Sequence, residues 1–375
     1  MCTLNIDAVS TSEDLEAFLD LPLQLYRGDR DYVAPLRPWL RRRLSVRNPF
    51  FQEAGLKLFV ARRGGEVLGT ISVLRDRRHE QHQKEKVAFF GFFEATRDQG
   101  VAQGLLEVAT DQARAWGADL LRGPRNLTRV EEMGTLVEGH GRPPMLAGHQ
   151  PFWYGDLLEA EGFEKHHDVL AYETPVVDEQ GNQRGLPDKL ARKAAAVDIP
   201  GLEVRSVRWL RARRDLSLAH EVFVDAFRDV PENTPMPRAQ FVNLGGAVLL
   251  LTNRHMLQLA LVDGRPAGFA LCFPELNEAA QHARGRLGPL GLWRFLTGLR
   301  RIETASFKLL GVLPEYRGTG LHALLIHHVV EGVKRAGYRR LEASLIDERN
   351  GPMRSIVESA GMTVYRRYRV YERPV

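Results

Sequence analysis

The stretch from Ser306 to Gly337, SFKLLGVLPEYRGTGLHALLIHHVVEGVKRAG, decides the fold of this 375-residue chain. It begins with a short apolar run that predicts a strand, and from Leu321 onward apolar residues recur at helical spacing. The turn between them carries Arg317, Gly318 and Gly320. Free N–H groups at a helix N-terminus attract anions, and glycine lets a phosphate approach the main chain closely. The stretch therefore predicts a strand, a phosphate-binding loop and a helix.

The loop differs from two common phosphate-binding patterns. It lacks the Lys-Ser/Thr ending of a P-loop and the three-glycine spacing of a dinucleotide-binding fold. Nucleotide hydrolysis and NAD binding are therefore disfavoured.

The sequence around this stretch occurs twice. Residues 61–74 align with 260–273, residues 91–106 with 311–326, and residues 157–173 with 356–372. Strand patterns separated by glycine turns and followed by helical patterns predict an α/β fold in each half, with a mixed sheet flanked by helices. We expect domains at 1–180 and 201–375, joined by a polar linker at 181–200.

Composition narrows the function classes. The 52 Lys and Arg residues outnumber the 47 Asp and Glu residues, so the net charge of +5 favours anionic partners. No basic arm with interleaved aromatics, zinc-finger spacing or RNA-recognition signature is present, which disfavours nucleic acid as a partner. No metal site is expected either. The N-terminal residues lack the pattern of a secretory signal and no apolar stretch is long enough to span a bilayer, so we expect a cytoplasmic protein.

The second-half loop resembles the acyl-CoA loop of the GNAT superfamily of N-acyltransferases, whose signature is Arg or Gln, two residues, Gly, one residue, then Gly or Ala. Arg317 and Gly320 match, whereas His322 takes the last position. Asn350 resembles the residue that holds the pantetheine arm in that family. The resemblance implies two tandem GNAT-like domains and contacts from acyl-CoA, as substrate, to Val312, Leu313, Arg317, Gly318, Thr319, Gly320, Leu321, His322, Asn350 and Met353.

The first-half loop also fits the signature, through Arg97, Gly100 and Ala102, but Asp98 stands where the second half has Gly318. A carboxylate in a phosphate cradle repels the ligand. We therefore interpret the first half as a degenerate copy and expect the acyl-CoA site in the second half.

N-acylation requires a neutral amine and, in many cases, an acid for the departing thiolate. Many relatives use a Tyr seven residues after the motif Asn, a position occupied here by Val357. Tyr365 and Tyr368 on the last predicted strand are candidate replacements, and Glu348, two residues before Asn350, is the leading carboxylate. Glu342 and Glu303 are weaker candidates because strand alternation leaves their face undecided.

An insert in the second half combines basic and apolar residues. From Ala279 to Ile302 there is no acidic residue, and five arginines alternate with Leu, Trp and Phe side chains. This pattern predicts an interfacial helix, with residues 284–301 on an anionic membrane surface at the inner face of the cytoplasmic membrane. A helix packed on the other domain is the alternative.

Together these features predict an acyl-CoA-dependent N-acyltransferase with a primary amine as acceptor. The tandem layout and the insert resemble bacterial acyltransferases of the ceramide-synthase type, which implies a long-chain acyl group and a sphingoid-type lipid amine. A soluble amine acceptor and a non-catalytic acyl-CoA sensor or scaffold remain alternatives.

Overall fold

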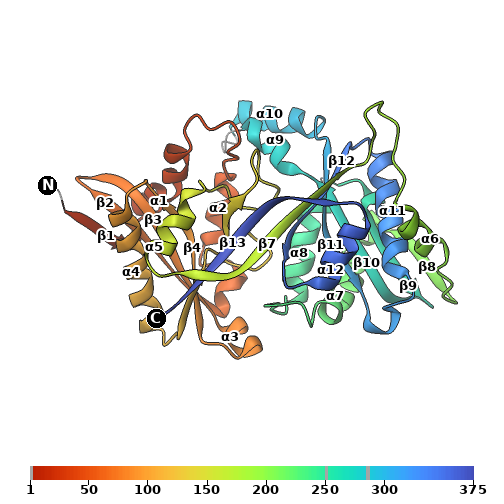
Figure 1. Ribbon diagram of the computed structural model, residues 1–375, viewed down its shortest axis with the longest axis horizontal. Helices are drawn as coiled ribbons and strands as arrows, with labels where there is room; N and C mark the ends of the chain where they lie inside the picture. Colours follow the sequence, from red (N-terminus) through yellow and green to blue (C-terminus); the bar gives the residue numbers. More distant parts are fainter. Residues whose placement is uncertain (1–2, 250–251, 284–287) are drawn as a thin grey trace. The chain divides into compact units, whose positions relative to one another are not determined.

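The computed structural model describes residues 3–249, 252–283 and 288–375 (Figure 1). The chain divides into two compact units. Unit 1 is Met1–Leu170 with Asn277–Gly298 and Arg366–Val375, and unit 2 is Ala171–Leu276 with Leu299–Tyr365. Each unit is a mixed sheet with helices, as the sequence predicts.

In unit 1 the sheet order is β1-β2-β3-β4-β5-β13. Strands β4 and β5 pair in parallel, while β1–β2, β2–β3, β3–β4 and β5–β13 are antiparallel. The elements before the crossing strand β7 are β1 (Leu4–Ala8), α1 (Ser12–Leu25), α2 (Arg37–Leu44), β2 (Ala54–Arg63), β3 (Glu66–Asp76), α3 (Arg77–Gln83), β4 (Val87–Ala95), α4 (Gln99–Ala115), β5 (Leu120–Gly123), β6 (Thr135–Glu138) and α5 (Trp153–Ala160).

In unit 2 the order is β7-β12-β11-β10-β9-β8, and β11 pairs with β12 in parallel. The remaining elements of the chain are β7 (Glu164–Pro175), α6 (Asp188–Ala195), β8 (Leu202–Ser206), α7 (Ala212–Ala226), α8 (Arg238–Leu249), β9 (Leu257–Val262), β10 (Arg265–Pro274), α9 (Leu276–Ala283), α10 (Pro289–Leu299), β11 (Thr304–Val312), α11 (Leu321–Arg335), β12 (Arg340–Asp347), α12 (Gly351–Ser359) and β13 (Thr363–Pro374).

The two aligned hairpin glycines have the same packing role in their units. A Cβ at Gly69 would overlap Leu105 and Val101 of α4, and a Cβ at Gly268 would meet Leu325 of α11 at 3.0 Å. In both units, therefore, the helix that follows the glycine loop lies directly on the central hairpin, and only glycine permits that approach.

The faces of the unit 2 sheet carry different helices. Because successive strand residues point to opposite faces, Gly268 under α11 and Phe269 lie on different sides. The ring of Phe269 packs against Phe227, just after α7, and Phe241 of α8, with centroids 6.4 and 6.3 Å away. Helix α11 thus covers one face, and α7 and α8 cover the other.

The last strand of each half crosses into the other unit. Residues 366–374 of β13 lie in unit 1, where Tyr371 is opposite Gly123 of β5, and residues 171–175 of β7 lie in unit 2 beside β12. Two aligned tyrosines mark the exchange. The Tyr371 hydroxyl donates to Glu159 of α5 at 3.0 Å, and the Tyr172 hydroxyl donates to Glu358 of α12 at 3.1 Å. Each tyrosine is thereby bonded to the helix of the half to which it does not belong in sequence.

The predicted polar linker at 181–200 contains a helix. Within α6, Leu190 and Ala194 are buried, and the helix packs on α11. The boundaries 1–180 and 201–375 remain a prediction about the duplication. The compact units follow a different division, because the terminal strands are exchanged and because Asn277–Gly298, within the second half of the sequence, belongs to unit 1.

Among the residues that the structure describes, no helix combines the length and apolar character needed to cross a membrane.

Candidate functional site

The two parallel strands of unit 2 separate soon after they begin to pair. Their register covers Thr304–Ser306 opposite Arg340–Glu342, whereas β11 continues to Val312 and β12 to Asp347. The pairing of β10 with β11 shifts register between Leu271 and Cys272, which leaves Lys308 as an extra residue in β11. A bulge bends its strand and re-aims the local side chains. Beyond Ser306 and Glu342, therefore, β11 and β12 no longer form a regular ladder with each other.

The glycine loop lies at the end of β11. The Leu313 N–H donates to the Ala267 carbonyl at 3.0 Å, which anchors the start of the loop to β10. Gly318 and Gly320 have φ of +84° and +89°, values that L side chains rarely adopt. Gly320 is the N-cap of α11 and has no side chain to cap the helix; the Thr319 hydroxyl accepts only a long bond of 3.4 Å from the Leu321 N–H. The N-terminus of α11 thus remains suited to an anion.

Basic groups surround this helix terminus. The Arg317 side chain donates to the Ala226 carbonyl at 3.2 Å and remains about half exposed, 3.8 Å from Asp229. The carbonyl of Lys193, in α6, lies 3.0 Å from where a Cβ at Gly320 would stand. Burial lowers the pKa of His322, and the positive charge of Lys193 lowers it further. The neutral imidazole of His322 and the cationic Arg317 are both compatible with a phosphate at the loop.

The corresponding loop in unit 1 already holds an anion of its own. Asp98 is the N-cap of α4, and its carboxylate accepts from the Gly100 and Val101 N–H groups at 2.9 and 3.4 Å. Arg63 donates to the same carboxylate at 2.9 Å and lowers the pKa of Asp98. The amides that would bind a phosphate are therefore satisfied internally.

The space beside β4 in unit 1 is also filled. After the three paired positions of β4 and β5, the Arg125 N–H donates to the Phe90 carbonyl at 2.7 Å, and the Asn126 side chain accepts from the Phe92 N–H at 2.6 Å. A Cβ at Gly91 would overlap the Arg125 carbonyl. In unit 1, therefore, residues after β5 bond to the part of β4 that β5 no longer pairs with. In unit 2, side chains of β11 and β12 meet at the corresponding place.

A pocket of about 190 Å³ lies within unit 2, on the α11 face. Its apolar lining from β11, α11 and β12 comprises Phe307, Leu310, Ile326, Val330, Leu341 and Ala343. Helix α12 adds Met353, Ile356 and Val357, and the rest of the lining comes from residues 174–176, 184–187 and 360–362. The predicted contact residue Met353 and the position where relatives have Tyr therefore share one pocket.

The residues between β12 and α12 hold one another in place. Asn350 is the N-cap of α12, and its side-chain oxygen accepts from the Met353 N–H at 3.2 Å. Arg354 donates to the Glu348 carbonyl at 3.2 Å, and Arg349 donates three hydrogen bonds to Asp347, two from its side chain and one from its backbone N–H. The Glu348 side chain is partly exposed. This arrangement fixes Asn350 and Glu348 at the C-terminal end of β12, on the same strand as part of the pocket lining.

A buried polar cluster, missed as a group by the sequence analysis, lies on the opposite face of the same strands. Glu342 accepts from the Ser306 hydroxyl, and Lys308 donates to Glu342 at 3.4 Å and to the Ser344 hydroxyl at 2.5 Å. The side chains of Glu342 and Lys308 are 2% and 9% exposed. The alternation Ser306-x-Lys308 and Glu342-x-Ser344 was the available signal. Glu303, the other carboxylate left open, is exposed.

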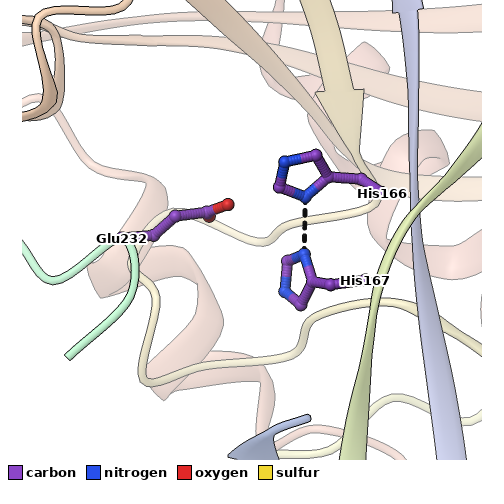
Figure 2. Close-up of side chains that lie close together, drawn as sticks. All are labelled: His166, His167 and Glu232. Atoms are coloured by element: carbon purple, nitrogen blue, oxygen red, sulfur yellow. Dashed lines mark hydrogen bonds between the residues drawn. The ribbon is translucent and has the colours of Figure 1, made fainter. Parts of the chain in front are cut away.

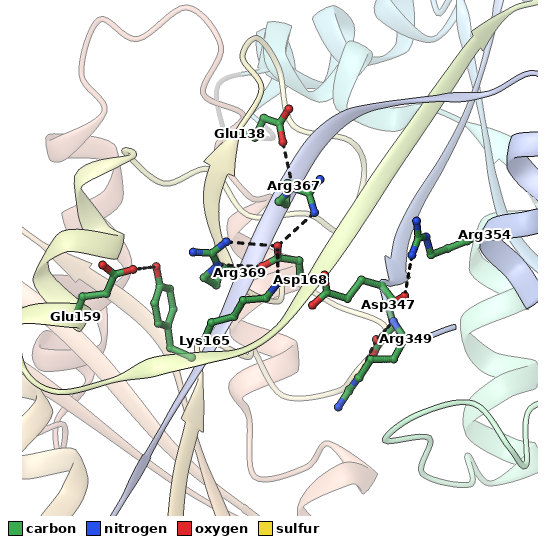
Figure 3. Close-up of polar contacts among 11 residues, drawn as sticks. Glu138, Glu159, Lys165, Asp168, Asp347, Arg349, Arg354, Arg367 and Arg369 are labelled. Carbon is green, nitrogen blue, oxygen red and sulfur yellow. Dashed lines mark hydrogen bonds and ion pairs between the residues drawn. The ribbon is translucent and has the colours of Figure 1, made fainter. Parts of the chain in front are cut away.

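The two candidate tyrosines lie in different units. Tyr365 is partly buried at the end of unit 2. Tyr368 lies fully buried in unit 1, where Arg366 donates to its hydroxyl at 3.2 Å. Near this part of β13, Asp168 of β7 accepts hydrogen bonds from Lys165 and Arg369, both at 3.0 Å, and from Arg367 at 3.3 Å (Figure 3). Catalytic roles for Tyr365 and Tyr368 remain predictions.

Unit 1 contains two further clusters of titratable groups. The Glu94 carboxylate accepts from the hydroxyls of Tyr26 and Tyr154 at 2.6 and 2.8 Å, and burial raises the pKa of Glu94 to about 8. On β7 the Nδ1 atoms of His166 and His167 are 2.6 Å apart, so one ring donates to the other (Figure 2).

The chain is similar to known proteins along nearly its whole length. Residues 19–123 and 218–362 match the model of the acetyltransferase (GNAT) family. A bacterial ceramide synthase of Caulobacter vibrioides is 31% identical, over 99% of this chain and 97% of that protein. Protein YghO of Escherichia coli is 28% identical, over 96% and 93%.

Two solved structures share the fold. A tandem GNAT protein from the clavulanic acid biosynthesis pathway has a TM-score of 0.59 at 16% identity, over 99% of this chain and 98% of that chain. A GCN5-related N-acetyltransferase from Sphaerobacter thermophilus has a TM-score of 0.54, also at 16% identity, over 99% and 95%.

Proposed function

Because the chain belongs to the acetyltransferase (GNAT) family, we propose that unit 2 binds a long-chain acyl-CoA and transfers its acyl group to a lipid amine. The membership confirms the predicted resemblance, the two tandem GNAT-like domains and an acyltransferase activity that uses acyl-CoA. The choice of unit 2 and the lipid acceptor are the proposal.

The uncapped N-terminus of α11 carries the assignment to unit 2. The phosphates of CoA would lie at Gly318, Thr319 and Gly320, with the backbone of Leu321 and the side chains of Arg317 and His322 beside them. Val312 and Leu313 would contact the beginning of the pantetheine arm of acyl-CoA, and Asn350 would hold this arm near Met353. The contrast with unit 1 supports this choice, because Asp98 there takes the place of the phosphate.

One observation favours a sphingoid-type amine as the acceptor: the relative from Caulobacter vibrioides is a bacterial ceramide synthase. A second observation concerns the acyl donor. The pocket on the α11 face is mostly apolar, which suits an acyl chain rather than an acetyl group alone. Glu348 and Tyr365, which belong to unit 2, remain the proposed groups beside the thioester, and a catalytic role for Tyr368, which lies in unit 1, stays a prediction from the sequence.

Exposed apolar and basic side chains on and next to helix α10 support binding of the protein to a membrane surface. Leu290, Leu292, Trp293 and Leu296 are 45–62% exposed on this helix. Arg294, Arg300 and Arg301 lie on or next to it, whereas Arg284 and Arg286 of the predicted patch lie outside the described residues. Each basic residue adds about 1 kcal/mol at an anionic leaflet. We therefore assign residues 289–301 to the inner face of the cytoplasmic membrane.

Vesicle sedimentation tests the membrane assignment. Leu296→Glu should lower the fraction bound to phosphatidylglycerol-containing vesicles, whereas Leu210→Glu, at a fully exposed leucine in unit 2, should leave it unchanged. Equal binding by both variants and the wild type would contradict it.

The central experiment compares the melting temperature with CoA, acetyl-CoA and palmitoyl-CoA. A ligand at about 100 times its dissociation constant adds about 2.7 kcal/mol of stability. We expect the largest upward shift with palmitoyl-CoA, its loss in Arg317→Glu, and its retention in Arg97→Glu, which changes the aligned arginine of the first half. No shift with any thioester in a folded sample would refute the proposal.

A non-catalytic acyl-CoA sensor is the second candidate, because Val357 occupies the pocket position where relatives have Tyr. Steady release of free CoA thiol in the presence of palmitoyl-CoA and a sphingoid amine would eliminate it. A soluble amine as acceptor would be indicated if thiol release were faster with a short polyamine.

A further inference from the structure

Glu342 carries a buried oxygen that the folded chain does not use. Its Oε2 atom accepts from Ser306 and Lys308. Its Oε1 atom is buried and has no hydrogen-bond partner among the described residues. Leaving a buried polar atom unpaired destabilises the folded state, and more so for a charged group. A buried acceptor of this kind, next to the point where β11 and β12 stop pairing, is a candidate partner for a donor on a ligand.

The position of Glu342 suits the second substrate of a transfer reaction. Leu341 and Ala343, its neighbours on β12, line the pocket on the α11 face. Glu342 and Ser344 therefore point to the opposite face, because strand side chains alternate. Beyond Ser306 and Glu342 the two strands are no longer paired. A thioester held from the pocket side can thus meet a group held from the other side where the strands separate.

The chemistry of the cluster selects a cationic donor. Ser306 and Lys308 both donate to one carboxylate oxygen of Glu342, which leaves the other oxygen as an acceptor for a group with N–H donors. A primary ammonium has three such donors and a positive charge, whereas a second carboxylate or a carbonyl oxygen would only meet repulsion. The negative charge of Glu342 also adds to burial in raising the pKa of the Cys272 thiol, which shows how close that charge lies to the core of the sheet.

We propose that Oε1 of Glu342 binds the ammonium group of the acceptor and removes its first proton. This inference rests on the proposed function, which it deepens by naming the acceptor-binding residue. The neutral amine attacks the thioester carbonyl carbon, the C–N bond forms and the C–S bond breaks. The thiolate of CoA takes up the proton that the new amide nitrogen loses, and Glu342 returns its proton to solvent.

The Glu342→Gln variant tests the assignment in the full chain, with Glu66→Gln, at an exposed hairpin residue of unit 1, as the matched control. The palmitoyl-CoA-induced melting shift should be unchanged in both variants, because the pocket is on the other face. With a long-chain alkylamine, kcat/KM should fall by about 10²–10⁴ in Glu342→Gln, as expected for loss of a general base, and remain unchanged in the control.

The basicity of the acceptor separates proton removal from a structural role. An O-alkyl hydroxylamine of the same chain length is already neutral at pH 7, so Glu342→Gln should lose much less activity with it. An equal loss with both acceptors would assign Glu342 to the structure alone and overturn the proposal, as would full activity of the variant with the alkylamine. Absence of any thioester shift or turnover in the wild type would instead refute the proposed function.

Discussion

The exchange of terminal strands predicts that a change near the C-terminus destabilises the first half of the chain. Tyr371 belongs to the second half in sequence, yet its buried ring is part of the unit 1 core with Phe90, Tyr154 and Phe163. The matching residue, Tyr172, belongs to the first half and lies in unit 2. Truncation of either tyrosine should therefore loosen the helix to which its hydroxyl is bonded.

The expected magnitude follows from burial. Tyr371 is 1% exposed, and removal of a buried aromatic ring costs about 3–5 kcal/mol, so Tyr371→Ala should lower the free energy of unfolding by that amount. The hydroxyl alone contributes little. Its partner Glu159 is exposed and can bond to water, so Tyr371→Phe should cost at most about 1 kcal/mol.

Amide hydrogen exchange resolved by peptide locates the effect, because local opening is reported separately for each element. In Tyr371→Ala we expect faster exchange in α5 and β5 with α12 unchanged. In Tyr172→Ala we expect faster exchange in α12 with α5 unchanged. Faster exchange of α12 in Tyr371→Ala, with α5 still protected, would refute the strand exchange.

Three further changes test other features of the structure. Asp98→Ala removes the N-cap of α4 and should lower the free energy of unfolding by about 1 kcal/mol in urea titrations, without changing the palmitoyl-CoA melting shift. In Gly320→Ala, the new side chain would have to adopt a φ of +89°, and its Cβ would lie 3.0 Å from the Lys193 carbonyl. This variant should therefore lose the melting shift with thioesters. It should also have a lower melting temperature than the control Gly264→Ala, whose new Cβ has no neighbour within 4 Å. The pKa of Glu94 is raised from 4.5 to about 8 in the folded protein, so between these pH values the folded state binds one proton more than the unfolded state. The stability that this group contributes is therefore fully present below pH 4.5 and is lost as the pH rises through 8. Glu94→Gln should remove a slope of up to about 1.4 kcal/mol per pH unit from urea titrations in that range, and identical slopes for variant and wild type would contradict this.

The fold of this chain can be predicted from local patterns in its sequence. The apolar run, the two glycines and the helical spacing of Ser306–Gly337 are contiguous, so their physical requirements can be recognised without the rest of the chain. Asp98 was recognised as incompatible with a phosphate for the same reason. The structure adds that the Asp98 carboxylate itself occupies the amides of the helix terminus.

The grouping of Glu342 with Lys308 could not be predicted with the same ease. These residues are distant in sequence, and an alternating strand pattern does not say which face is covered by which helix. The bulge at Lys308 adds a further difficulty, because beyond it the alternation no longer assigns side chains to faces: Phe307 and Leu310, three residues apart, both line the pocket.

The sequence by itself therefore determined the α/β class, the duplication, the family and the loop that suits a phosphate, because each depends on short-range spacing of residue types. Only the tertiary structure decided where the terminal strands pair, which side chains meet where β11 and β12 separate, and that the gap beside β4 is filled in unit 1. These outcomes depend on contacts between residues far apart in the chain. Local spacing carries little information about such contacts, since the free energy that selects them arises from packing and from satisfying buried polar groups.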